Sequence, residues 1–74
     1  MNTQPLSHYL VVTDDYITCT SPTPEREAFP FVTYPRKKLA KLGNKFVKSV
    51  KNMAKEHLIS ATFAEIIILA VQTA

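Results

Sequence analysis

The sequence predicts an α+β protein in which an N-terminal β-hairpin or set of short strands precedes two C-terminal α-helices. Residues 1–35 contain short runs of β-branched and aromatic residues, and Pro, Asp and Ser separate these runs. From Arg36 onward, apolar residues instead recur at every third or fourth position, which is the helical period. A length of 74 residues is enough for one small domain, so we treat residues 1–74 as a single unit.

The first predicted element is a β-hairpin. Residues 8–12 and 16–20 are both rich in β-branched and aromatic side chains, and the polar residues 13–15 between them suit a tight turn. Cys19 falls in the second of these runs, where it is expected to be a small core residue and not a nucleophile.

A loop and a third extended segment follow. Residues 21–27 contain two prolines and several hydroxyl side chains, which favour a loop over regular structure. Residues 29–34 have the composition of a strand, but Pro30 restricts it to an edge or to the start of a strand. Pro35 then marks a boundary and suits the first turn of a helix.

An amphipathic helix is predicted over about residues 36–58. The apolar stripe consists of Leu39, Leu42, Phe46, Val50, Met53 and His57. The opposite side follows the same steps with Lys41, Lys45, Lys48, Asn52 and Lys55. Gly43 lies within the apolar stripe, where it either admits a close neighbour or breaks the helix so that a new one starts at Gly43-Asn44.

A second helix is predicted from Phe63 to the end of the sequence. Thr62 and Glu65 fit a capping box, in which each side chain satisfies the other residue's backbone amide. This helix is apolar on nearly all sides, so it needs burial all round, and we expect a second copy of the chain to supply it. The predicted dimer interface comprises Phe63, Ile66, Ile67, Leu69 and Ala70.

Residues 44–74 resemble the helical part of the ribbon–helix–helix family of DNA-binding repressors and antitoxins. A helix with a late alanine (Ala54), a turn with Ser60, then Thr62-x-x-Glu65 and an isoleucine-rich helix follow the order seen in that family. The resemblance, extended to residues 37–74, implies that residues 37–42 form a strand that enters the major groove of DNA. The helical periodicity instead places residues 37–42 in a helix, and both interpretations stay open.

The charge distribution predicts an anionic partner. Residues 1–35 hold four acids and one base, whereas residues 36–74 hold eight bases and two acids. The leading hypothesis is a small DNA-binding regulatory homodimer whose lysine-rich face contacts phosphates. The predicted nucleic-acid-binding residues are Arg36, Lys37, Lys38, Lys41, Asn44, Lys45 and Lys48. In a ribbon arrangement, Asn44 and Ser60 would anchor phosphates at helix N-termini.

Other function classes fit less well. A phage- or plasmid-type protein that binds and inhibits a larger, acidic protein is the main alternative. Residues 58–74 are at the lower length limit for a membrane span and contain Glu65, so membrane association is disfavoured. No catalytic constellation, cofactor motif or set of metal ligands is recognisable in the sequence, which argues against an enzyme. An N-terminus unlike a secretory signal, together with a single cysteine, predicts a cytoplasmic protein.

Overall fold

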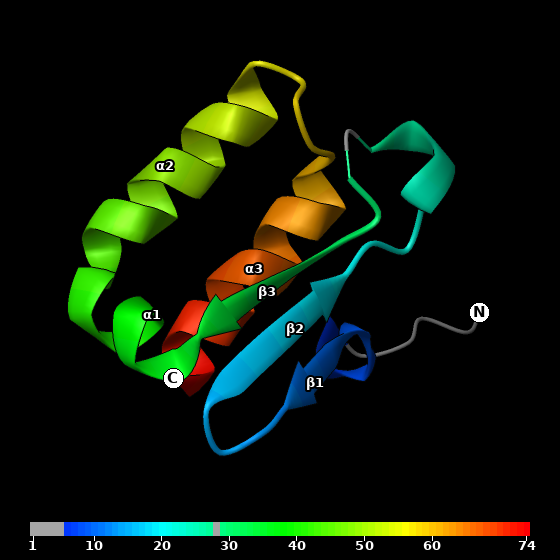
Figure 1. Ribbon diagram of the computed structural model, residues 1–74. Helices are drawn as coiled ribbons and strands as arrows, with labels where there is room; N and C mark the ends of the chain where they lie inside the picture. The colour runs from blue at the N-terminus through cyan, green and yellow to red at the C-terminus, as the bar shows by residue number, and fades with distance from the viewer. Residues whose placement is uncertain (1–5, 28) are drawn as a thin grey trace.

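The protein is built in two layers, a three-stranded antiparallel sheet and a layer of helices on one of its faces (Figure 1). The computed structural model describes residues 6–27 and 29–74. In chain order, its elements are η1 (Leu6–Tyr9), β1 (Leu10–Val12), β2 (Tyr16–Thr20), η2 (Pro24–Arg26), β3 (Phe31–Pro35), α1 (Arg36–Leu42), α2 (Asn44–Lys55) and α3 (Ala61–Thr73). The predicted α+β class, with strands preceding C-terminal helices, is therefore confirmed.

The sheet has the order β1-β2-β3, so β2 is central and both other strands are edges. The predicted hairpin is present, with Val12 opposite Ile17 and Leu10 opposite Cys19. Thr13 closes its turn, since the Thr13 hydroxyl and amide both donate to the carbonyl oxygen of Tyr16, at 3.0 and 2.8 Å. The predicted strand start at residue 8 is wrong, because residues 6–9 form a 3-10 helix instead.

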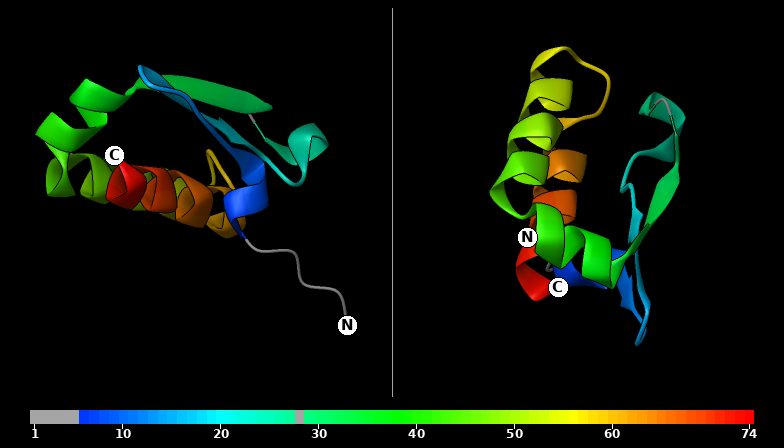
Figure 2. Two further views of the ribbon diagram at one scale, coloured as in Figure 1. Left: turned by 90° about the horizontal axis from the view of Figure 1, so that it is seen from below. Right: turned by 60° about the vertical axis from the view of Figure 1, so that its left-hand side comes forward.

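The alternation of side chains along the strands decides which face of the sheet packs on the helices. Ile17 and Cys19 on β2 are fully buried, and their neighbours Val32 and Tyr34 on β3 share the same face. Seen edge-on, the sheet forms the upper layer and α2 and α3 the lower one (Figure 2, left). The core of the protein therefore lies between β2 and α3.

The outer face of the sheet is covered by no described element and carries no charged side chain. Its exposed side chains include Val11, Tyr16 and Phe31. On the same face, the hydroxyls of Thr18 on β2 and Thr33 on β3 form a hydrogen bond of 3.1 Å. A period of two residues places all of these on the side opposite Ile17 and Cys19.

Gly43 breaks the predicted helix of residues 36–58 into α1 and α2, which decides between the two alternatives for that glycine. Its backbone angles of φ 50° and ψ −124° are ones that a residue with a Cβ rarely adopts. Its amide ends α1 by donating to the carbonyl of Leu39 at 2.9 Å, and its carbonyl accepts from the amide of Phe46 at 3.1 Å. Residues 37–42 are helical, so the strand that the family resemblance implies is not formed by them.

The ends of α2 and α3 are closed by local hydrogen bonds. After α2, the amide of Leu58 donates to Met53 and that of His57 to Ala54, which is the Schellman pattern. His57 occupies the left-handed position, with φ 62°, that glycine usually takes. The predicted capping box at Thr62 is wrong, because α3 begins two residues earlier and Ser60 is its N-cap, accepting from the amide of Phe63 at 3.1 Å.

Helix α3 is buried by its own chain, which changes the argument for a dimer. Phe63, Ile66, Ile67 and Ala70 are all fully inaccessible to solvent, because α3 packs on β2, η1, α1 and α2. Four of the five predicted interface residues therefore lie inside the folded chain, and only Leu69 is partly exposed. The inference that a second copy must cover α3 is corrected, and self-association through any other surface stays a prediction.

Candidate nucleic-acid interface

The positive charge of the protein lies on the outside of α1 and α2. Every lysine between residues 37 and 55 is exposed to solvent, and none makes an ion pair within the part of the chain that the structure describes. The cluster therefore consists of charges that are free to meet an external anion.

Helix α2 carries the most continuous part of this charge. Its inner side is set by Phe46 and by Val50, which is 1% exposed, whereas its lysines lie on the opposite side of the helix. We call these four residues, spaced by three or four positions, the α2 lysine face: Lys45, Lys48, Lys51 and Lys55. At 1.5 Å per residue, the face is about 15 Å long, which corresponds to roughly four phosphate steps along one DNA strand.

The sequence prediction included Lys45 and Lys48 but left out Lys51 and Lys55. The sequence spacing could have identified both residues, since Lys48, Lys51 and Lys55 are three and four positions apart and so share one side of a helix. Asn44, which was predicted, is exposed as the first residue of α2 and lies on the same side.

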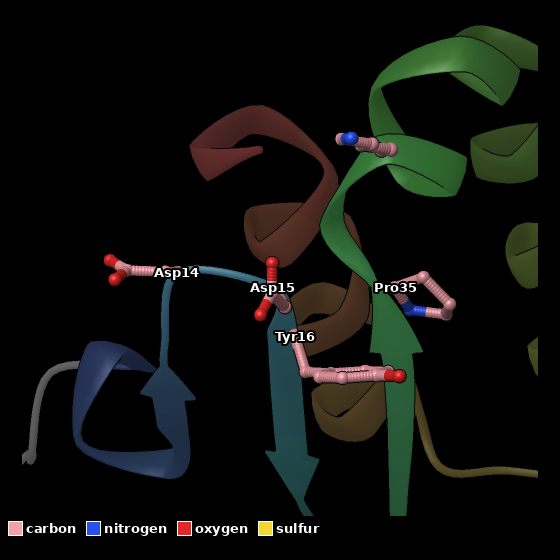
Figure 3. A pocket seen from close by; sticks show the side chains of 5 residues that line it. Asp14, Asp15, Tyr16 and Pro35 are labelled. Atoms are coloured by element: carbon pink, nitrogen blue, oxygen red, sulfur yellow. The ribbon is translucent and has the colours of Figure 1, made fainter.

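The lysines of α1 differ in their surroundings. Lys38 and Lys41 are exposed, and α1 follows directly from the end of β3 (Figure 1). Lys37 instead lines an open pocket of about 240 Å³ with Asp14, Asp15, Tyr16 and Pro35 (Figure 3). Two carboxylates near Lys37 reduce the local positive potential, so Lys37 is a weaker anion contact than Lys41.

Arg36 has a structural role that the sequence did not reveal. Its Nη1 donates to the carbonyl oxygen of Thr13 at 3.1 Å, and its amide donates to that of Asp15 at 2.9 Å. The two bonds tie the start of α1 to the β1–β2 turn, and the bond from Nη1 occupies part of the guanidinium that a bidentate base contact would need.

The N-terminus of α3 is not open to a phosphate, contrary to the role considered for Ser60. The amide of Ser60 donates to the two carboxylate oxygens of Glu27, at 2.9 and 3.3 Å. The same carboxylate accepts from the hydroxyls of Ser21, at 3.2 Å, and Thr23, at 3.4 Å. An internal anion therefore already fills the position that an external one would take.

Groups with chemical reactivity lie away from this surface. Burial raises the pKa of the Cys19 thiol to about 12, so it stays protonated at neutral pH. Burial, and secondarily the neighbouring Cys19, raises the pKa of Tyr34, whose ring packs edge-on against Phe46 with centroids 4.9 Å apart. Among residues 6–27 and 29–74, no three His, Cys, Asp or Glu residues come together as metal ligands would.

None of the helices in the described part of the chain is long and apolar enough to cross a membrane. Comparison with known proteins gives no relative, since no protein-family model, curated protein or solved structure matches this chain.

Proposed function

We propose that the protein is a small, non-enzymatic nucleic-acid-binding regulatory protein that holds the phosphate backbone with Lys41 and the α2 lysine face. The observation that carries the proposal is the alignment of four exposed lysines along one side of α2, with exposed Lys41 on the preceding helix, none of which has an ion partner among the described residues. Each lysine that neutralises a phosphate releases a bound counterion, and this release is the main source of non-specific affinity for DNA.

The composition of the surface favours backbone contact over base recognition. Lysine presents a point charge, whereas the bidentate contacts that identify guanine are made best by arginine. Arg36 is the arginine that precedes these lysines on α1, and its guanidinium is hydrogen-bonded to Thr13. Because residues 37–42 are helical, the proposal does not depend on the paired ribbon of the family that the sequence resembles.

The test compares the protein with two triple variants in binding to a 20-base-pair duplex of mixed sequence. Replacing Lys41, Lys45 and Lys48 by Glu is expected to abolish binding at 50 mM salt, and replacing all three by Arg is expected to retain it. All three side chains are exposed, so the far-ultraviolet circular dichroism of both variants should match that of the parent. Duplex binding that survives the Glu substitutions would remove the proposal.

Salt dependence and a competing polyanion separate nucleic acid from an acidic protein as the partner. The logarithm of the DNA-binding constant should fall linearly with the logarithm of the salt concentration, with a slope of about −4 for four or five contacts. Polyglutamate of equal charge should compete weakly with the duplex at 150 mM salt. If polyglutamate binds and the duplex does not, the lysines serve an acidic protein surface instead.

A further inference from the structure

The outer edge of β3 carries main-chain groups that no described strand uses. The amide of Ser21 donates to Pro30 and the amide of Arg36 donates to Asp15, both at 2.9 Å, at the two ends of the β2–β3 ladder. In an antiparallel ladder, alternate residues bond to the same neighbour, so Val32 and Tyr34 face β2. The N–H and C=O groups of Phe31 and Thr33 therefore point away from the sheet.

The space beside this edge is lined on its inner side by helix α2. In Figures 1 and 2, α2 lies in the helix layer, displaced past β3 on its unpaired side. Phe46 of α2 contacts Tyr34 of β3, and both Phe46 and Met53 are only partly buried. A strand added at about 4.8 Å from β3 would lie on the side of the sheet where Phe46 contacts Tyr34.

A second copy of the chain does not fit this edge. Pairing β3 with its twin would place the two strands about 4.8 Å apart, whereas packed helices need 8–10 Å between their axes. Because α2 already extends past β3, the twin's α2 would enter the layer that α2 and α3 occupy (Figure 1). An isolated extended segment brings no helix layer of its own, so it fits where a second copy does not.

The charge around the edge selects the chemistry of that segment. Lys38 and Lys41 of α1 and Lys45 at the start of α2 are exposed, and both helices begin beyond the Pro35 end of β3 (Figure 1). The inner side of the added strand would meet Phe46, whereas its outer side would extend the uncharged outer face of the sheet. The matching peptide is apolar on one side, uncharged on the other and acidic at the end that lies next to Pro35.

We propose that the free edge of β3 binds an extended peptide segment of a partner protein, acidic at the end next to Pro35, which adds to the sheet as a fourth strand. Affinity comes from main-chain hydrogen bonds to Phe31 and Thr33, and selectivity comes from the contacts with α2 and the lysines. The main-chain hydrogen bonds use the edge of the sheet and are distinct from the proposed DNA contact, whereas Lys41 and Lys45 are shared by the two proposals.

The test titrates the isotope-labelled protein with a seven-residue peptide that alternates valine and threonine between terminal aspartates. The amides of Phe31 and Thr33 should gain more than tenfold protection from hydrogen exchange, while those of Val32 and Tyr34, already bonded to β2, should change little. The same peptide with terminal lysines should bind at least tenfold more weakly. No added protection at Phe31 and Thr33 at millimolar peptide would overturn the proposal.

Two further comparisons test the main-chain contacts. Thr33→Pro removes an outward amide and should weaken peptide binding at least tenfold, whereas Thr33→Val keeps the amide and should preserve it. Both variants keep every lysine, so duplex DNA binding should be unchanged, which separates this proposal from the preceding one.

The peptide itself supplies a test that leaves the protein intact. Methylation of one set of alternate peptide amides should abolish binding, and methylation of the other set should not, because only one set faces β3. Equal effects of the two sets, or dimerisation of the protein through this edge, would contradict an added strand.

Discussion

Helices α2 and α3 are nearly equal in length, at 12 and 13 residues, yet they have opposite relations to solvent. Helix α2 places four lysines on one side and buries only Val50 completely. Helix α3 has no basic residue and buries five of its side chains. It packs against α2, β2, α1 and η1.

The difference teaches that the helix that forms the core is separate from the helix that carries the charged surface. A helix that is apolar on most sides stabilises a small protein only if other elements surround it, and here one chain of 74 residues achieves this by placing α3 at the centre. Helix α2 shields one side of α3 and leaves its own outer side free for charge. Substitutions on α3 should therefore change the free energy of unfolding, and substitutions on the α2 lysine face should change binding.

The largest effect is expected from Ile67→Asp. Ile67 is fully buried, so the variant places a carboxylate without a partner in the core, at a cost of about 3–5 kcal/mol. At about 0.05–0.15 kcal/mol per residue, a chain of 74 residues has about 4–11 kcal/mol in total, so the variant should lose a large part of its unfolding free energy, as measured by circular dichroism and urea titration. Thr62→Asp, at an exposed position of the same helix, is the control and should stay folded. A stable Ile67→Asp variant would contradict the central position of α3.

An intermediate effect is expected from Glu27→Ala. The substitution leaves the amide of Ser60 and the buried hydroxyl of Ser21 without their acceptor, at a cost of about 1–3 kcal/mol in unfolding free energy. Glu25→Ala, two residues away and exposed, should change the free energy by less than about 0.5 kcal/mol. Equal urea midpoints for the two variants would show that the N-terminus of α3 does not need Glu27.

Alkaline pH should weaken the core next to α3 through Cys19. The pKa of its thiol is raised from 9.0 to about 12 in the folded protein, so the folded state keeps a proton that the unfolded state releases. Stability should therefore fall as pH rises above 9, by at most about 1.4 kcal/mol per pH unit for this group. The pKa of Tyr34 is also raised, and its contribution has the same sign, so the measurement is best made between pH 9 and 10.

The control for this pH dependence is Cys19→Ala, which lowers the stability at every pH but lacks the thiol. Urea titrations at pH 7, 8, 9 and 10 should show a smaller decline above pH 9 in Cys19→Ala than in the parent. Identical declines in the two proteins would place the titrating group elsewhere.

The smallest effect on stability is expected from Lys48→Ala, although its effect on binding should be measurable. Lys48 is exposed and has no ion partner among the described residues, so the unfolding free energy should change by less than about 0.5 kcal/mol. The slope of DNA affinity against salt, on logarithmic axes, should decrease by about 0.9 if Lys48 contacts one phosphate. A large loss of stability would show that the exposed side of α2 also stabilises the fold.

The sequence by itself determined the elements and much of their order, because their signals are local. Alternating β-branched residues indicated the hairpin, and Pro30 indicated an edge strand. Steps of three and four residues placed Lys45, Lys48 and Lys55 on one side of a helix, although they also included Lys41, which lies in α1. The apolar pattern of residues 63–71 also required burial, and α3 is indeed the most buried helix.

Only the tertiary structure decided what covers each surface, since the contacts involved join residues far apart in the chain. Nothing local distinguishes burial of α3 by a second copy from burial by its own sheet and α2. The local sequence allows either Ser60 or Thr62 as the N-cap of α3. In the folded chain, Glu27, which lies 33 residues before Ser60, accepts a hydrogen bond from the amide of Ser60 and fixes the start of the helix. Likewise, the sequence alone suggests that Arg36 is a free cation. Its hydrogen bond to the carbonyl oxygen of Thr13 forms only because the hairpin turn lies against the start of α1.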